Sequence, residues 1–173
     1  SPPLDHLGLH TAIDPDDRLW VVDGRGRGLR VGLQDGSSQP LVVPIQRQLV
    51  GPLVWSHGAL YFGETDAQGT TALALYDPGS GAVRRLHRGS RGHSLLGLAA
   101  RGNRLWALFW ESGDRSRWSV TLVGLDPVTE QVLVQESRTA PWATRPTGLH
   151  SIVAGEDGSV WIASGLTGRV TFR

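Results

Sequence analysis

The stretch Asp14-Pro15-Asp16-Asp17-Arg18-Leu19-Trp20-Val21-Val22-Asp23 decides the fold, because it joins a polar turn to a short apolar run that contains a large aromatic residue. The same order of residues recurs three times, centred on Leu60-Tyr61, Leu105-Trp106 and Val160-Trp161. The aromatic residues of successive copies are 41 to 55 positions apart. A unit of this length cannot bury its own apolar face, so it must stack on its neighbours. The sequence therefore predicts a repeat architecture.

The repeated units have the composition of short β-strands. Glycine and proline together supply 33 of the 173 residues and interrupt every long segment, which argues against long helices. Between them lie short runs rich in Val, Leu, Ile, Trp and Thr, a pattern typical of strands joined by turns. The first strand of each unit is expected at 10–13, 49–55, 95–99 and 151–154.

These features predict an all-β protein: a β-propeller of about four blades, each a four-stranded antiparallel sheet, in one domain over residues 1–173. The last unit is one strand short, and residues 1–9 are the candidate to complete it and so close the ring. If they do not, the chain is a fragment of a larger ring or leaves an edge for a partner strand. The expected blades are approximately 10–44, 49–88, 93–136, and 148–173 together with 1–9.

Three parts of the chain resemble blades of known propeller families. The segment 14–23, with Gly28-Leu29-Arg30 after it, resembles two-component-regulator sensor propellers. Pro146-Thr147-Gly148 with the segment 156–161 is similar to a blade of the streptogramin-lyase propellers. The hairpin 75–83 is similar to blades of the quinoprotein-like superfamily, which includes non-catalytic scaffolds. The resemblance implies a propeller and covers families of several functions.

Composition excludes several classes of function. The formal net charge is +1, so no global field attracts nucleic acid or an anionic membrane. The chain has no cysteine, which excludes disulfides, thiolate metal sites and cysteine nucleophiles. No apolar run approaches the roughly 18 residues of a membrane-spanning helix. Ser1 is interpreted as a processed end, left either by signal cleavage or by simple removal of methionine, and we expect an extracytoplasmic location: periplasm, cell envelope or exterior.

Three histidines occupy matching places in the repeat. His10, His93 and His150 each stand where the innermost strand of a unit begins. Innermost strands line the channel of a propeller, so these imidazoles could converge there as ligands of a divalent metal. The alternative is that they hydrogen-bond neighbouring backbone. No cofactor is predicted, and a metal in the central channel is the alternative hypothesis.

The tryptophans divide into two groups. One group recurs with the repeat and is expected to pack between neighbouring sheets: Trp20, Trp106 and Trp161. The other does not recur, and because amphipathic aromatic residues are favoured at interfaces, it is a candidate for recognition: Trp110, Trp118 and Trp142. The last of these lies with Arg145 in an inserted loop, and its alternative role is to cap the core beneath that loop.

The densest basic stretch spans residues 84–93 and includes Arg88 and Arg91. It could contact an anionic polymer or an acidic partner, or it could be a solvated linker. No aromatic residues are interleaved with these arginines to stack bases, so nucleic acid is not expected as a ligand.

The sequence favours a non-enzymatic binding or scaffold propeller that recognises a protein partner or a small ligand at one face and could join a larger complex. One alternative is a metal-assisted lyase or hydrolase that uses the channel histidines. The other is a structural subunit completed by a partner strand.

Overall fold

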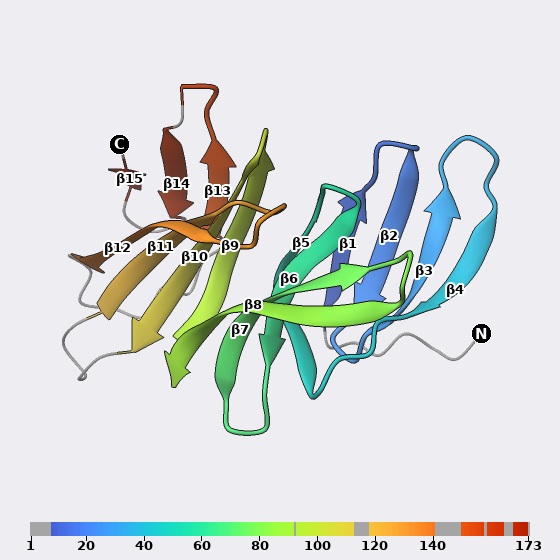
Figure 1. Ribbon diagram of the computed structural model, residues 1–173, viewed down its shortest axis with the longest axis horizontal. Helices are drawn as coiled ribbons and strands as arrows, with labels where there is room; N and C mark the ends of the chain where they lie inside the picture. Colours follow the sequence, from blue (N-terminus) through green and yellow to red (C-terminus); the bar gives the residue numbers. More distant parts are fainter. Residues whose placement is uncertain are drawn as a thin grey trace.

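Four antiparallel sheets make up the computed structural model, which describes residues 8–91, 93–112, 118–140, 150–157, 159–164 and 168–172. In this part of the chain every regular element is a strand, and none is a helix. We call the sheets blades 1 to 4 in chain order (Figure 1). The all-β prediction is confirmed.

Each of the first three blades has four strands that follow one another in the order of the chain. Blade 1 contains β1 (Leu9–Ile13), β2 (Arg18–Asp23), β3 (Arg27–Gly32) and β4 (Ser38–Val42). Blade 2 contains β5 (Gln48–Ser56), β6 (Ala59–Thr65), β7 (Thr70–Asp77) and β8 (Ala82–Arg91). Blade 3 contains β9 (His93–Arg101), β10 (Arg104–Ser112), β11 (Trp118–Leu125) and β12 (Val132–Ala140). Blade 4 has three described strands, β13 (His150–Ala154), β14 (Val160–Ser164) and β15 (Gly168–Phe172).

Aspartates organise the turns between these strands. Asp66 Oδ1 accepts hydrogen bonds from the backbone N–H groups of Gln68 and Thr70, at 2.8 and 2.9 Å. Asp126 does the same for the two residues that follow Pro127. Because a carboxylate can satisfy amides that the strand ladder leaves free, it favours a tight turn over an open loop. These hydrogen bonds, led by that from Thr70, hold the pKa of Asp66 below its ordinary value.

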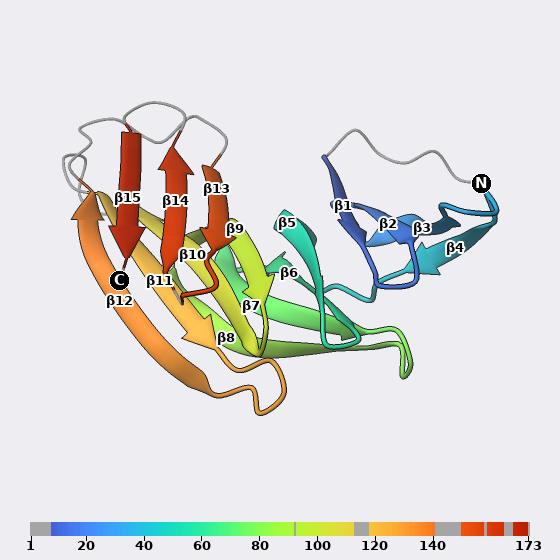
Figure 2. The ribbon, with the colours of Figure 1, turned by 90° about the horizontal axis from the view of Figure 1, so that it is seen from above.

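The blades stand side by side in an arc, with their innermost strands on its concave side (Figure 2). Strand β1 contacts β5, β5 contacts β9, and β9 contacts β13. The approach of β13 to β9 requires a glycine, because a Cβ on Gly97 would lie only 2.8 Å from Cγ2 of Ile152. This arrangement of radially stacked sheets is that of a propeller.

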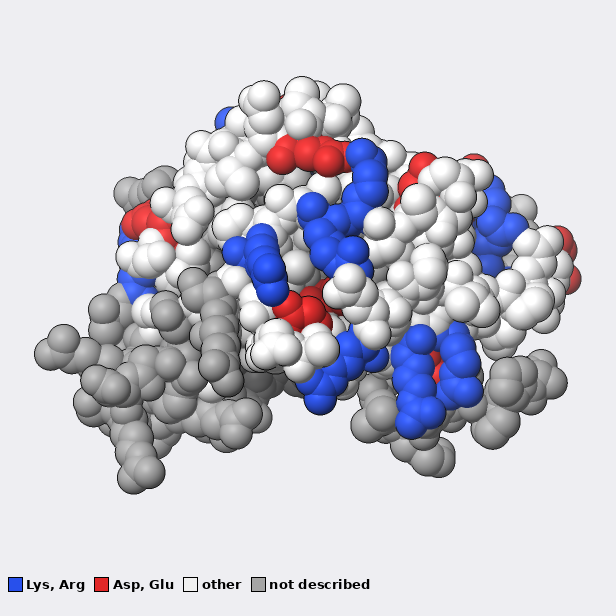
Figure 3. All heavy atoms as spheres, turned by 60° about the horizontal axis from the view of Figure 1, so that its bottom comes forward, with Lys and Arg blue, Asp and Glu red and all other residues white. Residues whose placement is uncertain are grey.

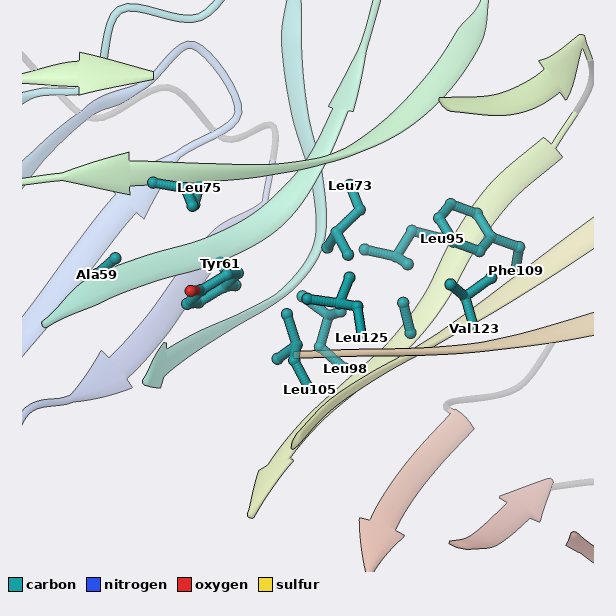
Figure 4. Packing of buried hydrophobic residues seen from close by; sticks show 11 residues of the cluster. Ala59, Tyr61, Leu73, Leu75, Leu95, Leu98, Leu105, Phe109, Val123 and Leu125 are labelled. Carbon is teal, nitrogen blue, oxygen red and sulfur yellow. The ribbon is translucent and has the colours of Figure 1, made fainter. Parts of the chain in front are cut away.

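Three apolar clusters hold the blades together, one at each junction. The cluster between blades 2 and 3 is built from β6 and β7 on one side and from β9, β10 and β11 on the other (Figure 4). Its buried members include Tyr61, Leu73, Leu105 and Phe109. Burial of such side chains contributes about 1.5–3 kcal/mol each, so the junctions between blades carry much of the stability.

Within the described residues the four blades do not close into a ring. Blades 1 and 4 lie at opposite ends of the arc (Figures 1 and 2). The predicted completion of blade 4 by residues 1–9 falls largely outside the described residues, which begin at Gly8, and Leu9 belongs to β1 of blade 1. In the described part of the chain, each of the two end sheets has a neighbouring blade on one side.

Candidate binding faces at the ends of the arc

The recurring aromatic residue has the same register in every blade. On the adjacent innermost strand, Trp20 is paired with Ala12, Tyr61 with Val54, Trp106 with Ala99, and Trp161 with Val153. Paired residues on neighbouring strands share a face of the sheet. The repeat therefore places an aromatic side chain and a smaller apolar one together on one face of each blade.

In the first three blades this aromatic face packs on the next blade. Trp20 stacks on Trp55 of blade 2, with ring centroids 5.3 Å apart. The Tyr61 hydroxyl reaches blade 3 and donates a hydrogen bond to the carbonyl oxygen of Pro127, at 3.3 Å. Trp106 belongs to the cluster between blades 3 and 4. The exposed fractions of these three residues are 1%, 1% and 5%.

Trp161 differs, because 38% of its surface is exposed. Its neighbours Val160 and Ile162 point the other way and are buried against blade 3. Its strand partner Val153 is 58% exposed. The expectation that Trp161 packs between two sheets is thus wrong for the described residues, because no sheet follows blade 4 there. We call Val153 and Trp161 the blade 4 end face.

Blade 1 presents a second apolar face at the other end of the arc. Trp20 and Val22 point toward blade 2, so the alternate residues of the same strand, Leu19 and Val21, point away from it. Strand pairing places further apolar residues on the same side as Leu19 and Val21. The exposed or half-buried members of this blade 1 end face are Leu9, Ile13, Leu19, Val21, Leu29, Val31 and Val42.

Apolar residues gathered on one sheet face are the usual material of a protein interface, because they gain free energy when another surface excludes water from them. An isolated exposed valine would need no explanation. Here the apolar residues form a set in register, and the equivalents of Trp161, Leu19 and Val21 in the other blades are buried. The two end faces are therefore the candidate binding surfaces of the described structure.

The sequence could have pointed to these faces. In blade 1 both sets of alternating residues are apolar, as in Leu19-Trp20-Val21-Val22. A strand that is apolar on both sides is expected to be covered on both sides. The tryptophans outside the repeat, which were the candidates for recognition, do not belong to these end faces, so the end faces were not predicted.

The three histidines are placed where the sequence predicted, on the innermost strands β1, β9 and β13. His10 is half-buried, and burial lowers its pKa despite a hydrogen bond to the backbone of Gly51. His93 is buried, with its ring 6.5 Å from that of Phe109. Among the described residues, no three His, Asp or Glu side chains form a group that could hold a metal ion. The side chain of His150 is outside that set, so the metal site stays a prediction.

The tryptophans outside the repeat have different surroundings. Trp110, a candidate for recognition, has its ring buried between blades 3 and 4, so it is not available to a partner there. The reason is its position on β10, where it alternates in step with Trp106 and Leu108 and faces the same cluster. Trp118 begins β11, but its side chain is not among those described, and Trp142 and Arg145 lie outside the described residues.

The basic stretch of β8 faces carboxylates, and Figure 3 shows arginine side chains lying against acidic ones on the face drawn there. The side chain of Arg91 is not among those described. A paired arginine is less available to an anionic ligand, because binding must first compete with its carboxylate. The described pairs are Arg84 with Glu130, Arg85 with Glu64 at 2.6 Å, and Arg88 with Asp66 at 2.6 Å.

Charged side chains also line a surface hollow where blades 3 and 4 meet. It contains Arg101, Arg104, Asp126 and Glu156 around the edge of Trp106. Arg101 pairs with Glu156 and also donates a hydrogen bond to the carbonyl oxygen of Ala154, at 3.3 Å. These contacts join the two blades and account for Arg101 and Glu156 in this hollow without a ligand.

Comparisons with known proteins agree with the fold. No protein-family model matches the chain, and no curated protein matches it. The chain is similar to a solved structure described as the computationally designed Ika4 protein, with a TM-score of 0.64 and 12% identity over 99% of this chain and 98% of that one. It is also similar to a glucose dehydrogenase, with a TM-score of 0.57 and 18% identity over 92% of this chain.

The chain spans 58% of the length of that dehydrogenase. At these identities the similarity is one of fold alone. The predicted architecture of repeated antiparallel blades is therefore supported. Fold and end faces together define an all-β protein of propeller-like blades with two apolar ends.

The described part of the chain contains no helix that could span a membrane.

Proposed function

We propose that this protein is a non-enzymatic scaffold of the propeller type, which binds a protein partner through the apolar end faces of blades 1 and 4. One observation carries the proposal. The repeat places an equivalent aromatic residue in each blade, and the exposed fraction rises from 1–5% in the first three to 38% at Trp161.

The energetics of the interior junctions support this function. Each junction is an apolar cluster formed by two sheet faces. An end face built from equivalent positions gains similar contacts when a complementary surface covers it, because the hydrophobic effect scales with the apolar area removed from water.

Glutamate substitutions on the two end faces test the proposal. Ile13→Glu and Val153→Glu introduce charge at positions that are 57% and 58% exposed, so they should leave the fold intact. Val128→Glu is the matched control, because Val128 is 66% exposed but lies in the turn after β11, outside both end faces. Far-UV circular dichroism and thermal unfolding check that all three variants fold.

Two measurements then apply to each purified protein: molar mass by light scattering over a range of concentrations, and fluorescence of the apolar dye anilinonaphthalene sulfonate. We expect the unmodified chain either to associate or to bind the dye. Both end-face variants should reduce that signal, and the control should not. A chain that stays monomeric and binds no dye would refute the proposal, as would equal effects of all three substitutions.

A further inference from the structure

We infer that the surface hollow between blades 3 and 4 is a binding site for a small organic carboxylate that carries an aromatic or aliphatic group. The volume of this hollow is about 710 Å³, and small-molecule sites have volumes of roughly 300–1,000 Å³. Every residue that lines it belongs to the described part of the chain. Neither Val153 nor Trp161 is among them, so the inference goes beyond the proposed function and does not depend on it.

The guanidinium of Arg104 is the group that binds the ligand carboxylate. Arg104 begins β10 on the same face as Trp106, which packs toward blade 4. It is paired directly with Arg101 on β9, and like charges in such a pair repel each other. Arg101 is neutralised by its ion pair with Glu156. Among the described residues no carboxylate forms an ion pair with Arg104, so its charge is available to a ligand.

The two aspartates that line the hollow already accept hydrogen bonds within their own turns. Asp126 Oδ1 accepts them from the backbone N–H groups of Val128 and Thr129, at 2.7 and 3.0 Å. Asp157 Oδ1 accepts them from the backbone N–H and the hydroxyl of Ser159, at 3.0 and 2.6 Å. The hydrogen bonds to Asp126, led by that from Thr129, hold the pKa of its carboxyl group below the ordinary value. These carboxylates therefore stabilise turns and leave Arg104 to a ligand.

Asn103 provides a second hydrogen-bond donor at the hollow. Its Oδ1 lies 3.2 Å from Nε2 of His57, in the turn between β5 and β6. Ser56 Oγ lies 2.9 Å from Nδ1 of the same imidazole. In a consistent network the serine hydroxyl donates to Nδ1, and the Nε2–H group donates to the oxygen of Asn103. The amide nitrogen of Asn103 is then a donor in the residue next to Arg104, and a carboxylate has two oxygens that can accept from both.

Apolar side chains define the rest of the ligand. Trp106, Leu133 and Ala154 line the same hollow as the guanidinium. Leu133 is 50% exposed, so a hydrocarbon group that covers it gains free energy by removing apolar surface from water. The ring of Trp106 favours contact with another aromatic ring. An inorganic anion would leave this apolar surface in contact with water, whereas a carboxylate attached to a hydrocarbon group covers it.

Titration with 3-phenylpropionate tests the inference, and 3-phenylpropionamide is the neutral analogue of similar shape. Isothermal titration calorimetry should show that the acid binds and that the amide binds about tenfold more weakly, because charge-assisted hydrogen bonds are roughly twice as strong as neutral ones. Added salt should weaken binding of the acid and not of the amide. In nuclear magnetic resonance spectra the indole N–H signal of Trp106, assigned from Trp106→Phe, should shift on addition of the acid.

Matched substitutions locate the site. Arg104→Gln removes the charge from the hollow, and Arg47→Gln is the control, because Arg47 is also exposed but lies between β4 and β5, outside the hollow. Arg104→Gln should weaken binding of the acid by about tenfold or more and remove the preference for acid over amide, while Arg47→Gln should change neither. Leu133→Ala should weaken binding of both compounds by about threefold or more. Far-UV circular dichroism checks that each variant folds.

Three results would overturn the inference. The first is the absence of heat and of a Trp106 shift with the acid at concentrations up to about 10 mM, which is weaker than a useful small-molecule site. The second is equal affinity for acid and amide, since the ligand is then not recognised as a carboxylate. The third is an equal effect of Arg104→Gln and Arg47→Gln, which would mean that general attraction to a positive surface accounts for binding. The light-scattering and dye measurements on the end faces are independent of all three.

Discussion

Gly124→Ala should destabilise the protein by crowding the aromatic residue of blade 3. Gly124 is paired with Trp106 across β10 and β11. A Cβ added at Gly124 would lie 2.5 Å from Cζ3, 2.8 Å from Cε3 and 3.0 Å from Cη2 of that ring. Favourable carbon–carbon contacts are at about 3.5–4.0 Å, so the ring would have to move by about 1 Å.

The ring has little room for that movement. Trp106 is only 5% exposed, and it packs in the cluster that joins blades 3 and 4. Overpacking of this kind costs about 1–3 kcal/mol. Alanine also reduces the entropy of the unfolded chain, which offsets about 0.4–1 kcal/mol of that cost. We therefore expect a net loss of about 1–2 kcal/mol, or a fall in melting temperature of about 2–8 °C for a chain of this size.

A double-mutant cycle with Trp106→Phe isolates the contact. The three ring atoms nearest the added Cβ all belong to the six-membered ring of the indole. The smaller side chain of phenylalanine places no atoms at those three positions. In the Trp106→Phe background, Gly124→Ala should therefore cost less, with a coupling energy of about 0.5–2 kcal/mol. Urea unfolding followed by far-UV circular dichroism measures all four proteins. Gly124→Ala with unchanged stability, or with the same cost in both backgrounds, would refute the reasoning.

Three further results are expected. In the Ile13→Glu background, Trp106→Ala should lower the free energy of unfolding by about 3–5 kcal/mol, because it opens an enclosed cavity. The loss from Trp161→Ala should be smaller than the loss from Trp106→Ala by about 1–2 kcal/mol, because Trp161 is partly exposed and its removal leaves no enclosed cavity. Equal losses in urea titrations would contradict this. Glu64→Ala should cost about 1–3 kcal/mol at pH 7, because it removes the buried carboxylate that binds a partly exposed guanidinium; an unchanged urea midpoint would contradict it. Burial lowers the pKa of His87 from 6.5 in the folded protein, so the unfolded chain binds more protons and stability should fall as the pH drops below about 6.5. His87→Gln should flatten that dependence between pH 5 and 8, and an equally steep profile would contradict the assignment.

Much of the fold could be predicted from the sequence because the signals are local. Short apolar runs such as Leu60-Tyr61-Phe62 indicate buried strands, and aspartates such as Asp66 and Asp126 set the turns. These interactions act over two to six residues. The repeat of the aromatic residue then indicated that the sheets stack.

The candidate site was less predictable, because burial depends on what lies beyond each sheet. Trp106, Trp110 and Trp161 are the same residue type in similar strands. Trp110 is buried although it lies outside the repeat, and Trp161 is partly exposed although it belongs to it. Neither outcome follows from local pattern, since each depends on whether a neighbouring blade is present.

By itself, the sequence determined that the chain folds as all-β blades, approximately where the first strand of each blade lies, and that an aromatic residue marks each blade. Only the tertiary structure decided that the described blades form an open arc and that Ile13 and Trp161, in the blades at its two ends, are 57% and 38% exposed. The physical reason is the range of the interactions: strand period and turn chemistry are encoded within a few residues, whereas closure of a ring depends on the small rotation between successive blades added over the whole chain.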